Sequence, residues 1–208
     1  MKPFLQIIGF WGAVLLGAWI YISADVPQPS GVLVSSDPNQ VDIVPRRWTR
    51  GEAHFTALAQ FDLRARVLST NHYSFDRQAD LSPVDFALGW GRMSDSDVLS
   101  DIKITQSGRF YFWRTRYGRM LPIPRNEVIS HSANMHMIPA DDDVKKILLD
   151  VRTGEIVALS GFLVQVTKPN GWVWKTSLSR TDTGNGACEV VWVERVSHSG
   201  TMLVRASR

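Results

Sequence analysis

The chain has 208 residues, which suits one domain or one domain with an extension, because domains usually contain about 100–200 residues. Hydrophobic residues make up 44% of the sequence, enough to bury a core, and the single cysteine excludes an internal disulfide. The formal net charge is only +3, so attraction of the whole protein to nucleic acid is not indicated and no nucleic acid partner is expected.

The first segment of the chain is a candidate membrane anchor. Residues 4–22 are almost entirely apolar, and about 20 such residues cross a bilayer as a helix. The apolar part of a cleavable signal peptide is shorter, about 7–15 residues, so we predict an uncleaved anchor over residues 1–23, with a removed signal peptide as the alternative. Lys2 precedes the segment and no acidic residue occurs before Asp25, which predicts a cytoplasmic N-terminus in the inner membrane. The rest of the chain then faces the periplasm or the cell exterior.

Three small residues recur at every fourth position within this segment: Gly9, Ala13 and Gly17. This spacing places them on one face of a helix, where small side chains allow a second helix to approach closely. The pattern therefore predicts oligomerisation through the anchor, and a chance arrangement of small residues is the alternative.

Residues 24–50 form a segment rich in proline and serine. Such a composition predicts an extended linker that holds the following domain, residues 51–208, away from the bilayer. The prolines of this segment are Pro27, Pro29, Pro38 and Pro45.

The first half of the domain combines one clear strand pattern with a long stretch that has no period. Apolar and charged residues alternate over much of residues 61–68, which predicts a half-buried strand. Residues 71–91 show no clean period and predict an ordered irregular region, a kind of long loop that is often functional. The acidic run from Ser94 to Asp97 predicts the start of a short helix, since it lacks the glycine and the distal glutamate of a calcium-binding loop.

Residues 102–125 carry basic and aromatic side chains and no acidic residue. This composition is typical of a surface that binds an anionic polymer, and we expect a lipid head group or an acidic polymer as its ligand. The predicted ligand-binding residues are Arg109, Trp113, Arg114, Arg116 and Arg119. The stretch also predicts a strand around residues 110–114, whose basic residues would alternatively neutralise the acidic residues upstream across a sheet.

The second half of the domain predicts one helix followed by strands. The acidic residues Asp141 to Asp143 open a helix with one apolar face, and Gly154 ends it. Asn170 and Gly171 predict a hairpin turn. The strand patterns cover residues 155–167, 172–176, 188–193 and 201–204. Together these elements predict an α+β fold: a single N-terminal transmembrane helix followed by an OB-like antiparallel sheet or partial barrel with one or two short helices.

Histidines and the single cysteine are the candidate catalytic residues. His131, Asn134 and His136 lie in one otherwise apolar stretch, and Cys188 follows a glycine-rich loop. A thiol nucleophile needs a base and a group that orients the base, so His131 or His136 would be the base and Asn134 the orienting group. The alternative is that Cys188 is a small buried apolar residue, as cysteines without a disulfide usually are.

Neither a metal site nor a cofactor is predicted. His131 and His136 are five residues apart, which places them on different faces of a strand or a helix, and no third ligand is evident. His72 and His198 are expected to be surface or loop histidines. The leading hypothesis is a membrane-anchored extracytoplasmic domain of the cell envelope that binds an envelope protein, a lipid or an anionic polymer. A hydrolase or transferase that uses Cys188 is the alternative.

Overall fold

The computed structural model describes residues 25–116, 118–179, 184, 187–199 and 204–205. Its strands are β1 (Asn39–Arg50), β2 (Ala53–His72), β3 (Val84–Gly89), β4 (Ile102–Ser107), β5 (Phe110–Thr115), β6 (Ser132–Pro139), β7 (Ile156–Thr167), β8 (Val173–Lys175), β9 (Glu189–His198) and β10 (Val204–Arg205). Its helices are the 3-10 helix η1 (Gly91–Ser94) and the α-helices α2 (Ser96–Asp101), α3 (Arg125–Ser130) and α4 (Asp142–Asp150). The predicted anchor, with Gly9, Ala13 and Gly17, lies outside the described residues, and no helix within them is long and apolar enough to cross a membrane.

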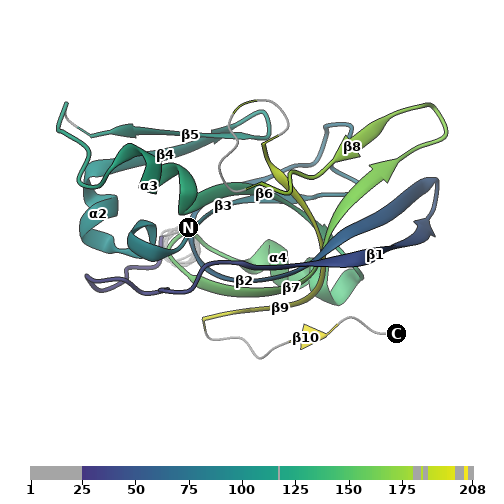
Figure 1. Ribbon diagram of the computed structural model, residues 1–208, viewed down its shortest axis with the longest axis horizontal. Coiled ribbons are helices and arrows are strands. Elements are labelled where there is room, and N and C mark those ends of the chain that lie inside the picture. Colours follow the sequence, from purple (N-terminus) through teal and green to yellow (C-terminus); the bar gives the residue numbers. More distant parts are fainter. Residues whose placement is uncertain (1–24, 117, 180–183, 185–186, 200–203, 206–208) are drawn as a thin grey trace, which may run out of the picture.

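Strands β2, β3, β6, β9 and β7 form a closed ring, since each pairs with the next and β7 pairs back with β2 (Figure 1). All these pairings are antiparallel except that of β6 with β9, which is parallel. The sequence predicts an antiparallel sheet. The parallel pair arises because α4 and β7 lie between β6 and β9 and return the chain in the same direction. The result is a β-rich α+β fold with a large mixed sheet and few helices.

The inside of the ring holds the main hydrophobic core. Alternate residues of the long strand β2 point into it, among them Phe61 and Leu63, as the predicted alternation requires. Met135 and Met137 of β6 also enter this core. The ring is therefore filled by side chains.

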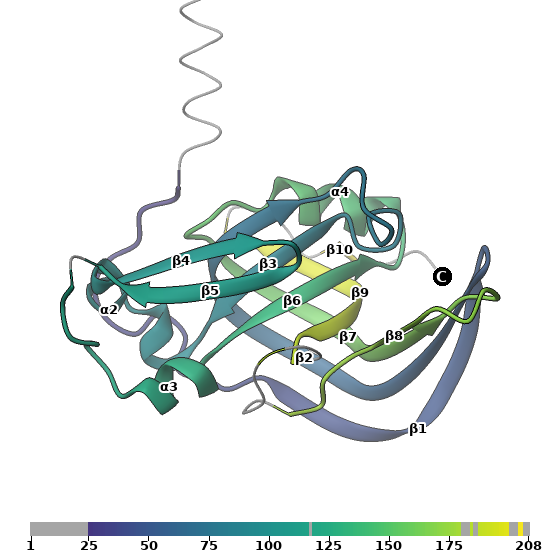
Figure 2. The same ribbon diagram turned by 90° about the horizontal axis from the view of Figure 1, so that it is seen from above.

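Helix α4 packs against the ring (Figure 2). The carboxylate of Asp141 accepts a hydrogen bond from the backbone N–H of Val144 at 2.9 Å and caps the start of the helix. Val144 and Leu148 are fully buried in the ring core. The predicted helix between Asp141 and Gly154 is confirmed.

Strand β1 occupies part of the segment for which the sequence predicts a linker. It pairs with β2 in an antiparallel ladder and is an edge strand of the sheet. Pro45 is accommodated because the ladder is irregular between Asp42 and Arg46, and because an edge strand has backbone N–H groups that need no partner strand. Proline content therefore marks a strand edge here, where the sequence predicts an extended spacer.

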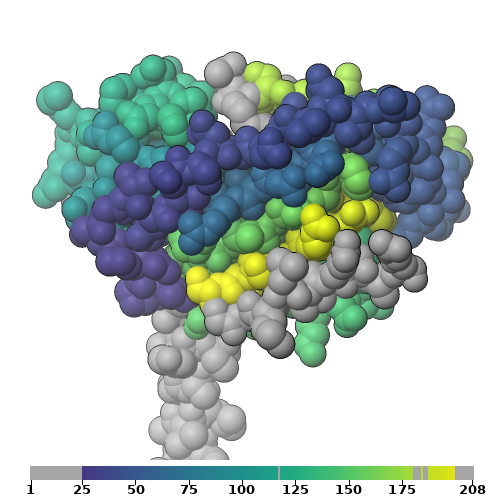
Figure 3. Space-filling view, turned by 60° about the horizontal axis from the view of Figure 1, so that its bottom comes forward, coloured from purple at the N-terminus to yellow at the C-terminus, as the bar shows by residue number. Residues whose placement is uncertain are grey.

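Residues 25–38 also lie along the domain (Figure 3). The backbone N–H of Val26 donates to the carbonyl oxygen of Thr153 at 2.8 Å, and that of Gly91 donates to the carbonyl oxygen of Val34 at 2.8 Å. Val34 itself is fully buried in the core. This segment is consequently part of the folded unit.

Strands β4 and β5 form a hairpin that lies outside the ring, against β3 and β6 (Figure 2). Tyr111 and Trp113 of β5 face inward and pack on a separate hydrophobic cluster that contains Met93 and Val128. Phe112, between them, is 55% exposed. The predicted strand around residues 110–114 and its alternation are confirmed.

Strand β3 lies within residues 71–91, for which the sequence predicts an irregular region. That prediction is wrong over Val84–Gly89, because these residues form a strand that pairs with β2 and β6. Every residue of this strand is buried. The ring core covers one face and the β4–β5 hairpin covers the other, so no alternation of polar and apolar residues appears in the sequence.

Candidate functional site

Polar side chains gather on the outer face of β3 and β6, beneath the hairpin. Because Met135 and Met137 face the ring core, Asn134 and His136 of β6 face outward. Asp85 of β3 lies directly opposite His136 in the antiparallel register. All three polar side chains are buried, although they lie outside the main core.

Cys188 joins this group from the segment just before β9. Its Sγ lies 3.9 Å from Nδ2 of Asn134 and 3.9 Å from the carbonyl oxygen of Arg109. The residue is half-buried. The parallel pairing of β6 with β9 produces this proximity, since it aligns His136 with Val190, two residues beyond Cys188.

Arg109, at the tip of the hairpin, connects the polar groups. Its Nε donates to Asp76 at 2.8 Å, and its terminal nitrogens donate to Asp85 at 2.9 Å and to the carbonyl oxygen of Ser82 at 2.9 Å. Its guanidinium carbon lies 3.8 Å from the ring centroid of Tyr73. The side chain of Arg109 is only 11% exposed and that of Asp85 is fully buried. Where the sequence predicts a ligand-binding arginine, the structure places an internal ion pair that fastens the hairpin to β3.

The backbone at this tip is strained. Gly108 has a φ of 56° and Arg109 a φ of 70°, as a two-residue type I′ turn requires. Among the described residues, Arg109 is the one non-glycine residue with a positive φ. This conformation costs a non-glycine residue about 1–2 kcal/mol, so the bonds of the guanidinium must hold the turn against that cost.

His136 faces Asp85 with one edge of its ring and a cavity with the other. Its Nδ1 lies 2.9 Å from Oδ2 of Asp85, a close contact that does not have the alignment of a hydrogen bond. Its ring centroid lies 4.8 Å from that of Trp174, and its side chain is 5% exposed. Within the described part of the chain, Nε2 has no hydrogen-bond partner. His136 lines a cavity of about 320 Å³ together with Cys188.

The other predicted base, His131, lies elsewhere. It follows α3, with its Nδ1 3.0 Å from the hydroxyl of Ser130 and its Nε2 3.9 Å from a carboxylate oxygen of Asp37. The structure therefore brings His136 to the cavity of Cys188 and leaves His131 outside it.

His198 is buried, in contrast to its predicted surface position. Its Nδ1 lies 2.7 Å from Oε2 of Glu155, which is also buried. This contact joins β9 to the residue before β7. No group of three or more histidine, cysteine, aspartate or glutamate residues in the described part of the chain is arranged to hold a metal ion.

Two adjoining cavities form a cleft over the polar face. One, of about 600 Å³, lies between β5 and the segment that leads into β9. The other is the cavity of about 320 Å³ between the hairpin tip and β8. Both are lined by Phe110 and Cys188, so Cys188 lies where they meet. The residues that line the cleft include six aromatic ones: Phe110, Tyr111, Phe112, Trp113, Trp172 and Trp174.

The remaining predicted ligand-binding arginines, Arg114, Arg116 and Arg119, are all exposed, and two of them contact groups of the protein itself. Arg114 is exposed on the outer face of the hairpin, opposite Lys103. Arg119 forms an ion pair with Asp101 at 2.7 Å, and Nε of Arg116 donates to a backbone carbonyl of β4 at 3.3 Å. The pairing of Arg119, like that of Arg109, matches the alternative prediction that these basic residues neutralise acidic ones upstream.

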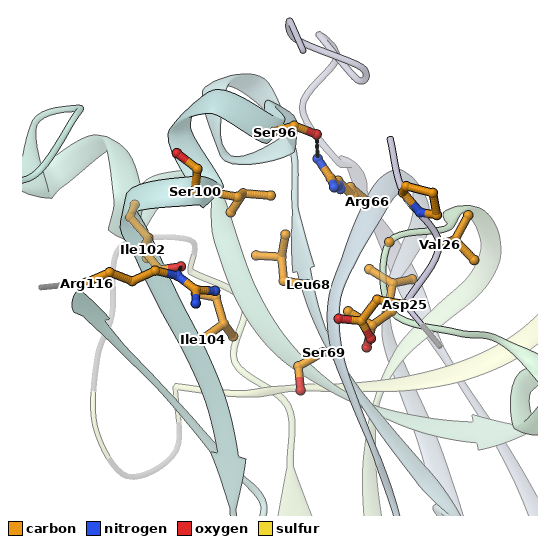
Figure 4. Close-up of a pocket in the computed structure, with 15 residues that line it drawn as sticks. Asp25, Val26, Arg66, Leu68, Ser69, Ser96, Ser100, Ile102, Ile104 and Arg116 are labelled. Atoms are coloured by element: carbon orange, nitrogen blue, oxygen red, sulfur yellow. Dashed lines mark hydrogen bonds between the residues drawn. The ribbon is translucent and has the colours of Figure 1, made fainter. Parts of the chain in front are cut away.

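A separate cavity of about 550 Å³ lies between β2, α2, β4 and residues 25–27 (Figure 4). Arg66 and Arg116 line it, and Arg66 donates to the hydroxyl of Ser96 at 2.8 Å. Burial lowers the pKa of Arg66, and the charge of Asp95 opposes this shift. Its described lining has serines but no imidazole to act as their base and no aromatic platform, so the cleft is the stronger candidate site.

The comparisons with known proteins add no assignment. No family model, curated protein or solved structure matches this chain.

Sequence reasoning missed several residues of the site: Asp85, Asp76, Tyr73 and Trp174. A signal existed for Asp85, which is an acidic residue between the apolar residues Val84 and Phe86. A carboxylate in such a buried run needs a cationic partner. The partner, Arg109, comes from a distant segment that the sequence does not connect to β3.

We expect the phenol of Tyr73 to titrate late. Burial and the adjacent carboxylate of Asp85 raise the pKa of Tyr73 to about 12, against an ordinary value of 10. As the pH rises, the unfolded chain releases the phenol proton before the folded protein does. The contribution of this phenol to the free energy of unfolding is therefore fully present below about pH 10 and is lost as the pH rises toward 12. Near-ultraviolet absorbance should show one step near pH 12 that Tyr73→Phe removes and Tyr111→Phe leaves in place. Its persistence in Tyr73→Phe would contradict the assignment.

Proposed function

We propose that this chain is a membrane-anchored extracytoplasmic domain of the cell envelope that binds an acidic oligosaccharide in the cleft. The observation that carries the proposal is the cleft itself, in which aromatic side chains lie beside buried polar residues on the outer face of β6. Aromatic side chains arranged as platforms, with a few placed polar groups, are typical of ligand sites.

The strand order supports this location. The ring has a helix between its third and fourth strands and a parallel pair between its third and fifth, and we assign it to the OB type. In OB barrels the face of the second and third strands binds oligonucleotides or oligosaccharides. Here those strands are β3 and β6, and residues of β6 line both cavities of the cleft. The fold alone does not establish a function, so the proposal rests on the residues of the cleft.

Charge favours an acidic ligand. Arg125 lines the larger cavity together with the buried Glu189, and Lys175 and Arg109 line the smaller one. The guanidinium carbon of Arg125 lies 5.8 Å from the ring centroid of Trp113, which places a cation beside an aromatic platform. An acidic sugar presents both features that these side chains recognise, an apolar ring face and a carboxylate.

The location outside the cytoplasm rests on the apolar segment of residues 4–22 and on Lys2 before it. In that location nucleic acid is scarce and acidic polysaccharides are common. An envelope protein with acidic, aromatic side chains is the competing partner.

Binding can be tested with oligosaccharides of matched length. We expect the full-length protein in detergent micelles to bind hyaluronan hexasaccharide more tightly than uncharged chitohexaose, in titration calorimetry at low salt. Phe112→Ala should weaken binding about tenfold, the effect of losing one aromatic contact of about 1.4 kcal/mol.

Phe75→Ala is the matched control, because Phe75 is fully exposed in the loop before β3 and does not line either cavity of the cleft. Equal effects of the two substitutions would contradict the cleft as the binding site. A failure of both oligosaccharides to bind at millimolar concentration would overturn the proposed ligand class.

A further inference from the structure

We infer that Cys188, His136 and Asp85 form a thiol acyl-transfer site in the floor of the cleft. The inference rests on the proposed function, because its substrate is an ester group carried by the bound oligosaccharide. It identifies Cys188 as the nucleophile, His136 as the base and Asp85 as the residue that positions the base.

The three residues come together on one side of the ring. Asp85 of β3 lies opposite His136 of β6, and His136 lies beside Val190 of β9, two residues after Cys188. His136 and Cys188 line the same cavity of about 320 Å³. The chain segments that carry them are far apart in sequence, so their meeting is a product of the ring topology.

The imidazole of His136 has one ring nitrogen without a hydrogen-bond partner. Nδ1 of His136 lies 2.9 Å from Asp85, so Nε2 is on the opposite edge of the ring, where it has no hydrogen-bond partner among the described residues. Only 5% of the His136 side chain is exposed. An imidazole nitrogen without an internal partner, on a side chain that lines a cavity, is suited to accept a proton from a group within that cavity.

The imidazole of His136 is held in place by its neighbours. The carboxylate of Asp85 has its other oxygen bound by Arg109 at 2.9 Å, and Trp174 packs on the imidazole ring. A positioned carboxylate next to Nδ1 stabilises the imidazolium that forms when Nε2 takes a proton, which is the arrangement that nucleophilic catalysis requires. Asn134, predicted as the orienting group, instead contacts Cys188 through its Nδ2 at 3.9 Å.

The reaction follows from these positions. Nε2 of His136 takes the proton of the Cys188 thiol, and the thiolate attacks the carbonyl carbon of the ester. The S–C bond forms, the C–O bond to the sugar oxygen breaks, and the imidazolium returns the proton to that oxygen. Water then attacks the thioester with His136 as base, releases the carboxylic acid and regenerates the thiol. The smaller cavity, with Trp172 and Trp174 in its walls, suits a short apolar acyl group such as acetyl.

The experiment uses full-length protein in detergent and p-nitrophenyl acetate, a small ester that does not need the larger cavity. We expect a burst of p-nitrophenol equal to the protein concentration and the gain of one acetyl group in the intact mass. Cys188→Ala should abolish both signals. His136→Gln should slow acetylation about a hundredfold or more, and His131→Gln, the matched control outside the cleft, should leave it unchanged.

A second measurement needs no variant. Iodoacetamide should modify Cys188 faster in the folded protein than in the same protein unfolded in urea, because the thiolate is the reacting species. Modification only after unfolding, or acetylation that is unaffected by His136→Gln, would overturn the inference. Acetylation without oligosaccharide binding would contradict the proposed ligand and support the thiol site. Oligosaccharide binding without acetylation would support the proposed ligand and contradict the thiol site.

Discussion

Replacing Arg109 by alanine should lower the free energy of unfolding by about 3–5 kcal/mol, the effect of removing one partner of a buried ion pair. The carboxylate of Asp85 is fully buried and would lose its cationic partner, and Asp76 would lose two hydrogen bonds. The alanine would also retain the positive φ of the hairpin tip, which now lacks the side-chain bonds that oppose its strain. Urea denaturation followed by circular dichroism measures the difference.

Arg114→Ala is the matched control, because Arg114 is on the exposed face of the same hairpin. Its effect should stay within about 0.5 kcal/mol, as for most surface substitutions. Adding Asp85→Asn to Arg109→Ala should recover part of the lost stability, since the uncompensated charge is then removed. Equal stabilities of Arg109→Ala and Arg114→Ala would contradict the internal role of Arg109.

Replacing Gly161 by alanine should be comparably damaging, for a steric reason. A Cβ atom at this position would overlap the carbonyl oxygen of Trp192 on the neighbouring strand β9. The overlap is with backbone at an irregular point of the β7–β9 ladder, so no side-chain rotation relieves it. We expect a loss of about 3 kcal/mol or more in the free energy of unfolding, the upper end of the usual cost of overpacking.

Gly171→Ala provides the comparison for this prediction. Gly171 lies in the turn before β8 with a φ of 82°, and an added Cβ would meet no atom within 4 Å. Its substitution should therefore cost only the backbone strain of about 1–2 kcal/mol. If Gly161→Ala is no more destabilising than Gly171→Ala in thermal unfolding, the close approach of β7 and β9 is not the reason for glycine at that position.

The sequence predicts elements that have a local signal. The alternation within β2, the capped helix at Asp141 and the Asn170–Gly171 hairpin each follow from residues close together in the chain. It does not predict β3, because burial on both faces removes the alternation that identifies a strand. It misplaces β1 because prolines mark linkers and edge strands alike.

The candidate site is only partly predictable for the same reason. Cys188, Asn134 and His136 have the residue types expected of a thiol site, and two of them come from one short stretch. Asp85 and Arg109 enter through the pairing of β3 with β6 and through the hairpin, which are contacts that no local pattern encodes. The choice of His136 over His131 required the parallel register of β6 and β9.

The closed ring has a consequence for the order of folding. Its closing pairs join residues as distant in sequence as His54 and Thr167, and β9 must then insert between β6 and β7. Such non-local pairing makes folding slow, because a long loop must be ordered before the contacts that stabilise it form. Until β9 has been synthesised, β6 and β7 present unpaired edges, and the emerging chain is then most prone to aggregation. A chaperone that shields these two strands during synthesis or export would act at the step where this protein is most vulnerable.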